Sequence, residues 1–251
     1  LYSVDVVITS DQTKWTRVPV IEMCPDRNLA EGGVRRFGLR AGQSVDKNGN
    51  PAPVGSEPST NADDPNYISG TGMSWFPGYA INVETGERLN MAFGENSWMV
   101  QYNGRDMLWN PSPVIADLFN VIFGGMHYIY VFGHTSGLQT GYPQFDSPAY
   151  DAGEWARGLI ADENFRRYAY ANVMWVNIPM QNFQYDFLAT DVKIRIRVAR
   201  PYQKNWAITG SDNPVNDNWP LYTFSTNDIA TTTNSNTAAV EALDIINVVP
   251  N

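Results

Sequence analysis

The chain has 251 residues, 43% of them hydrophobic and 13% aromatic, which is enough apolar material for a buried core and excludes a disordered polypeptide. Its formal net charge of −9 disfavours nucleic acids and anionic membranes as partners, because both are bound through lysine and arginine. No run of about 18 apolar residues occurs, so the sequence predicts no transmembrane segment, and the single cysteine, Cys24, excludes an intrachain disulfide.

The first predicted elements are two short strands and a loop. Val4, Val6 and Ile8 alternate with Asp5 and Val7, which predicts a strand at the start of the sequence. Residues 17–22 form a second predicted strand, placed near a sheet edge because Pro19 cannot donate a backbone hydrogen bond. Residues 41–70 are rich in proline, asparagine and glycine and predict a long loop.

A β-hairpin is predicted in the tryptophan- and glycine-rich centre of the chain. Residues 79–83 and 88–93 flank a polar turn at residues 84–87, in which Gly86 can adopt a positive φ. The turn and its flanking apolar residues together indicate antiparallel pairing.

Two helices and three further strands are predicted in the second half. Ser112-Pro113 is typical of a helix start, and apolar residues recur at helical spacing up to Gly124-Gly125, so a short buried helix is expected there. A second short helix is expected over residues 151–160. Strands are predicted at residues 127–132, 168–178 and 191–198, the second of them buried on both faces.

These elements are mostly short strands separated by Gly, Pro and Asn turns. We therefore predict a mainly-β fold, an antiparallel β-sandwich with a few short helices and long loops. Residues 1–225 are predicted to form this module, and residues 226–251 a polar tract, a short helix and a linker to a C-terminal domain missing from this chain.

Exposed aromatic residues are candidates for sugar binding, because a flat indole face can stack on a sugar ring. Trp75, Trp98 and Trp219 lie near polar or Gly/Pro-rich loops. The competing interpretation is that they are core residues, which is the more common role of tryptophan.

A calcium site is the one cofactor hypothesis. Its candidate ligands are the oxygen-bearing side chains of Asp212, Asn213, Asn216 and Asp217. Residues 46–50 carry a similar pattern but lack a closing glutamate, so a solvated turn is expected there instead.

No catalytic residue is assigned, because no Ser-His-Asp arrangement, HExxH motif or phosphate-binding glycine loop occurs. Glu95, Asp106 and Glu154 lie near aromatic residues and are the best carboxylates for a glycoside hydrolase, although any chain with 26 acidic residues offers such pairs. His127 and His134 are seven residues apart, which puts them on opposite faces of an extended segment and makes them a poor metal-binding pair.

Five phrases carry a resemblance to a known kind of protein: KWTRVPV at 14–20, GQSVDKNG at 42–49, WFPGYAIN at 75–82, ETGERLN at 84–90 and ALDIINVVPN at 242–251. Together they resemble a segment near the C-terminal end of large secreted proteins of Bacteroidetes, where a β-sandwich sorting domain for the type IX secretion system follows. The resemblance implies a secreted or outer cell-surface location, with other domains of the same polypeptide or surface proteins as partners. It carries over no catalytic residue.

The leading functional prediction is a non-enzymatic structural or adhesive module of a large secreted cell-surface protein. The alternatives are a carbohydrate-binding module that uses exposed aromatic residues, and a secreted glycoside hydrolase or peptidase.

Overall fold

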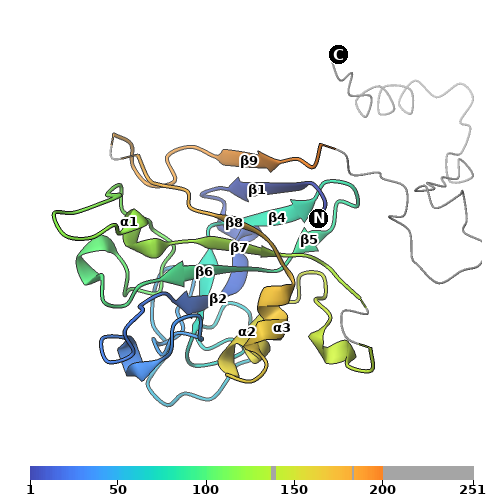
Figure 1. The fold of residues 1–251 in the computed structure, drawn as a ribbon, viewed down its shortest axis with the longest axis horizontal. Coiled ribbons are helices and arrows are strands. Elements are labelled where there is room, and N and C mark those ends of the chain that lie inside the picture. Colours follow the sequence, from blue (N-terminus) through green and yellow to red (C-terminus); the bar gives the residue numbers. More distant parts are fainter. Residues whose placement is uncertain (137–139, 183, 200–251) are drawn as a thin grey trace, which may run out of the picture. The chain divides into compact units, whose positions relative to one another are not determined.

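The chain is built on two β-sheets, seen in a computed structural model that describes residues 1–136, 140–182 and 184–199 (Figure 1). These residues fall within one compact unit, Leu1–Pro201. The strands are β1 (Val4–Ile8), β2 (Thr16–Glu22), β3 (Met73–Phe76), β4 (Gly78–Asn82), β5 (Arg88–Leu89), β6 (Met91–Glu95), β7 (Ile129–Phe132), β8 (Val173–Asn177) and β9 (Val192–Ile196). The helices are η1 (Gln12–Lys14), η2 (Glu31–Gly33), η3 (Val100–Tyr102), α1 (Phe123–Met126), η4 (Pro143–Phe145), α2 (Glu154–Ala161) and α3 (Arg166–Ala171).

The first sheet has the strand order β5-β4-β1-β9, and the second has the order β3-β2-β6-β7-β8. Strand pairs are antiparallel except β2 with β6, which run parallel. The mainly-β prediction is therefore confirmed, with one parallel pair that the sequence did not predict. Within the described ranges, no helix is long and apolar enough to cross a membrane.

Strand β2 is not an edge strand, contrary to the prediction from Pro19. Its first half pairs with β3, ending at Pro19 opposite Met73, and its second half pairs with β6 from Val20 onward. Pro19 lies where the strand changes partner, so its missing N–H leaves no gap in either set of hydrogen bonds.

The predicted hairpin forms, with Ala80 opposite Leu89 and Gly86 at a φ of 72° in the turn. Its second strand is interrupted, however. Chain segment 88–93 was expected to be continuous, but it divides at Asn90 into β5 in one sheet and β6 in the other. This division connects the two sheets through one short segment.

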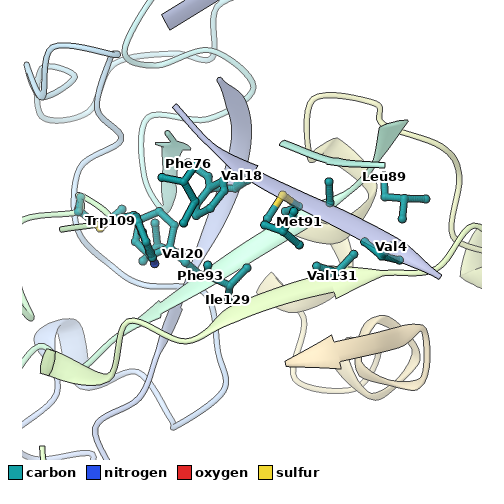
Figure 2. Packing of buried hydrophobic residues seen from close by; sticks show 14 of the residues in the cluster. Val4, Val18, Val20, Phe76, Leu89, Met91, Phe93, Trp109, Ile129 and Val131 are labelled. Atoms are coloured by element: carbon teal, nitrogen blue, oxygen red, sulfur yellow. The ribbon is translucent and has the colours of Figure 1, made fainter. Parts of the chain in front are cut away.

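The main core cluster draws side chains from both sheets (Figure 2). Val4 and Leu89 come from the first sheet, whereas Val20, Phe93 and Val131 come from the second. Burial of each such side chain stabilises the fold by about 1.5–3 kcal/mol, so this cluster contributes strongly to its stability. A second cluster packs α2 and α3 against the second sheet, with Phe132 edge-on to Trp155 at 5.6 Å.

Two predictions for the second half of the chain are wrong. Residues 114–122 form no helix but a hairpin-like loop, in which Ala116 is bridged to Val121. Residues 168–178 are not one strand buried on both faces, because their first part belongs to α3 and β8 is a half-exposed edge strand.

The remaining predictions are either confirmed or concern residues that the structure does not describe. The strand at 127–132, the helix at 151–160 and the strand at 191–198 correspond to β7, α2 and β9. Residues 41–70 contain isolated bridges but no helix or strand, as expected for a long loop. The predicted boundary at residue 225 and the elements expected beyond it lie outside the described residues.

Candidate functional site

A buried arginine, Arg40, organises a cluster of charged side chains. Its Nη1 donates to the Glu95 carboxylate and to the carbonyl oxygen of Gly104 at 3.0 Å. Its Nη2 pairs with Glu31, and its Nε lies 3.7 Å from Glu22 Oε2. The side chains of Arg40, Glu22 and Glu95 are all fully buried.

The pairing of strands explains why this cluster exists. Glu22 on β2 and Glu95 on β6 are register partners, so two carboxylates lie side by side in the interior. Like charges in such a position destabilise a sheet unless a cation lies between them. The backbone N–H of Arg40 donates to Val20 O at 2.9 Å, which holds residue 40 beside β2 and its guanidinium against both carboxylates.

Burial shifts the pKa values of two groups in this cluster, Glu95 and His127. Burial raises the pKa of Glu95 well above its usual value, and the neighbouring negative charge of Asp106 raises it further, despite the opposing effect of Arg40. Burial lowers the pKa of His127, which favours the neutral imidazole. His127 Nε2 lies 3.9 Å from Glu95 Oε1.

The structure brings together two of the three carboxylates proposed for hydrolysis. Glu95 and Asp106 are neighbours, whereas Glu154 lies in the first turn of α2 and outside the cluster. Glu95 is completely buried and bonded to Arg40, so it cannot touch a sugar or a peptide in this conformation. This burial argues against the pair as a glycosidase acid and nucleophile, because both groups must reach the substrate.

Sequence reasoning did not predict the roles of Arg40, Glu22 and His127. No local sequence pattern indicates that they lie together, because these residues are far apart in the chain and meet only through strand pairing. His127 and His134 lie in different surroundings: His127 is buried, while His134 is half-exposed and contacts Glu87 at 2.8 Å.

The tryptophans proposed for sugar binding differ in exposure. Trp75 is only 7% exposed, with Lys47 Nζ 4.4 Å from its ring centroid and Arg17 on it at 5.3 Å. Trp98 is 48% exposed and remains available for stacking. Trp219 lies outside the described residues.

The candidate calcium ligands Asp212, Asn213, Asn216 and Asp217 also lie outside the described residues. The similar segment at residues 46–50 is a turn, in which the Asp46 carboxylate accepts backbone hydrogen bonds from Asn48 at 2.8 Å and Asn50 at 2.9 Å. These bonds, with that from the Asn50 amide, lower the pKa of Asp46. Cys24 is a buried free thiol.

An apolar cavity of about 480 Å³ lies beside the C-terminal part of the described chain. Trp109, Met180 and Phe187 contribute to its lining. Of the described residues that line it, only Asp186 is charged, so they offer no pair of charged acid–base groups.

Among the described residues, several exposed apolar side chains gather on the loop that replaces the predicted helix, here called the apolar hairpin (residues 115–122). Leu118 is 93% exposed and Phe119 is 89% exposed, with Ile115 and Val121 more than half exposed beside them. Contiguous apolar exposure of this kind marks contact surfaces in soluble proteins.

Asp117 fixes the shape of the apolar hairpin. Its carboxylate accepts hydrogen bonds from the backbone N–H groups of Phe119 at 2.9 Å and Asn120 at 2.6 Å, and from the Tyr102 hydroxyl at 3.0 Å. The backbone bonds, together with the Tyr102 hydroxyl, lower the pKa of Asp117. The tip therefore presents its two apolar side chains from a hydrogen-bonded turn.

Comparison of the chain with protein-family models, with curated proteins and with solved structures gave no match.

Proposed function

We propose that this chain is a non-enzymatic structural or adhesive module of a large secreted cell-surface protein, and that the apolar hairpin is its contact surface. The exposure of Leu118 and Phe119 carries the proposal. A leucine and a phenylalanine at the tip of one loop can fill a partner's pocket as paired anchors. Their removal from water would supply the binding energy.

The hydrogen bonds of Asp117 support the same function. A loop that is ordered before binding loses less conformational entropy when a partner engages it. The partner class follows from charge and from the phrases that resemble secreted Bacteroidetes proteins: other domains of the same polypeptide or neighbouring surface proteins, rather than nucleic acid.

The test measures binding between this chain and the other domains of its parent polypeptide, produced separately, by biolayer interferometry. We expect Phe119→Ser to weaken binding at least about tenfold, equivalent to about 1.4 kcal/mol, because it removes one apolar anchor. The circular dichroism spectrum should not change, since the Phe119 side chain buries almost nothing within the chain.

Val54→Ser is the matched control, because Val54 is 90% exposed but lies in the long loop at residues 41–70. Its variant should bind as the unaltered chain does. If Phe119→Ser binds with unchanged affinity, or if no domain of the polypeptide binds the unaltered chain, the proposed contact surface is wrong.

Carbohydrate binding is the second candidate, favoured by the exposed ring of Trp98. If it holds, a glycan array should show a ligand for the unaltered chain, and Trp98→Ala should abolish the signal because it removes the indole face on which the sugar would stack. Tyr142→Ala, at a similarly exposed aromatic residue, should retain the signal. An array with no ligand, or an unchanged signal for Trp98→Ala, would exclude this role for Trp98.

A further inference from the structure

Three donor groups converge beside the buried arginine. Glu95, Asp106 and His127 each offer one ligand atom, and these atoms all lie within 4.8 Å of one another. Glu95 comes from β6, Asp106 from the loop after η3, and His127 from the segment that leads into β7. A single ion bound here would join three segments that are distant in sequence.

Two of these atoms are unsatisfied in the interior. Glu95 Oε1 and His127 Nε2 are buried, 3.9 Å apart, and neither has a hydrogen-bond partner among the described residues. Buried polar atoms are normally paired, so the space between these two atoms is a candidate position for an ion. This space lies next to the Asp106 carboxyl group and the Asn103 and Leu108 carbonyls, which also act on Glu95 and His127. Donor atoms around tetrahedral zinc lie about 3.4 Å apart, so the three ligand atoms, which lie within 4.8 Å of one another, would move closer together when an ion binds.

The imidazole of His127 is held in the orientation that metal binding requires. Its Nδ1 lies 2.6 Å from the carbonyl oxygen of Gly124, which can only accept, so Nδ1 carries the hydrogen. In the neutral ring, Nε2 then has its lone pair free. Metal-ligating histidines are characteristically fixed through the other ring nitrogen in this way.

Both carboxylates are also held by neighbouring groups. Glu95 Oε2 pairs with Arg40 and accepts the backbone N–H of Met107 at 3.2 Å, which leaves Oε1 for a further ligand. Asp106 accepts from the N–H of Leu108 and the amide of Asn110, each at 2.9 Å. Asp106 is exposed, so an ion could enter from solvent on its side.

The charges favour a divalent cation. When all its acidic groups are ionised, the cluster has four carboxylates and only two guanidinium groups: Glu22, Glu31, Glu95 and Asp106 against Arg40 and Arg105. One divalent ion would neutralise the difference. An imidazole with two carboxylates suits a transition metal, whereas calcium prefers oxygen ligands alone.

From these contacts, we propose that Glu95, Asp106 and His127 form a binding site for one divalent transition-metal ion of the zinc class. The three residues leave a fourth coordination position for water. This proposal does not depend on the apolar hairpin, so the two can be tested separately.

The test is isothermal titration calorimetry of the full chain, first treated with a chelator, with zinc chloride as the probe. We expect one equivalent to bind, and Asp106→Asn to weaken that binding at least about tenfold because a carboxylate ligand is lost. Asp106 is exposed, so this variant should fold normally. In the unaltered chain, zinc should also shift the ¹⁵N resonance of His127 Nε2.

His134→Gln and Asp63→Asn are the matched controls, because each removes an exposed group of the same chemistry elsewhere. Both should bind zinc as the unaltered chain does. The absence of saturable binding would overturn the proposal and leave a proton shared by Glu95 and Asp106 in that space. Unchanged affinity of Asp106→Asn, loss of binding in His134→Gln, or tighter binding of calcium than zinc would also overturn it.

Discussion

Replacement of Arg40 with methionine should lower the free energy of unfolding by about 3–5 kcal/mol. Arg40 lies between the buried carboxyl groups of Glu22 and Glu95, and the variant would leave both of these acidic groups without their cationic partner in the interior. Methionine has a similar volume, so the loss would report the missing charge rather than a large cavity. Urea denaturation monitored by tryptophan fluorescence measures it.

Arg35→Met is the control, since Arg35 pairs with Glu163 at 3.6 Å on the surface. Exposed pairs contribute about 0–1 kcal/mol, so this variant should be nearly as stable as the unaltered chain. A double variant, Arg40→Met with Glu95→Gln, should recover part of the lost free energy of unfolding, because it removes one of the two acidic groups that Arg40→Met leaves without a partner. A loss below about 1 kcal/mol for Arg40→Met would show that the cluster does not stabilise the fold.

Gly78→Ala should lower the free energy of unfolding by at least about 3 kcal/mol. Gly78 begins β4 at a φ of 156°, and a Cβ there would lie 1.9 Å from the carbonyl oxygen of Val7. The obstacle is backbone on the neighbouring strand β1, so no side-chain rotation relieves it. Thermal denaturation by circular dichroism would show a greatly lowered Tm.

Gly86→Ala separates this crowding from the general cost of a positive φ. Gly86 has a φ of 72°, and no atom lies within 4 Å of a Cβ built on it. We expect its variant to lose only about 1–2 kcal/mol, the cost of a left-handed conformation with a side chain. Equal losses at the two glycines would contradict the proposed clash with β1.

Local patterns were reliable where one periodicity acted alone. The alternation over residues 4–8 corresponds to β1 with the same bounds, and Gly86 marks the hairpin turn as predicted. The helix prediction over residues 114–122 is wrong because it rests on apolar spacing alone and leaves out the hydrogen bonds that Asp117 can make. Its carboxylate takes the N–H groups of Phe119 and Asn120, which a helix would need for its own bonds.

The sequence by itself determined the mainly-β class, the positions of several strands, the acidic character and the single free cysteine, because these depend on composition and short-range periodicity. Only the tertiary structure decided that Glu22 and Glu95 are neighbours, that Arg40 lies between them and that His127 faces Glu95. These contacts depend on strand register between distant segments, and no local pattern encodes that register. The exposure of Leu118 and Phe119 also depends on the tertiary structure, because an apolar residue is buried only where other parts of the chain pack against it.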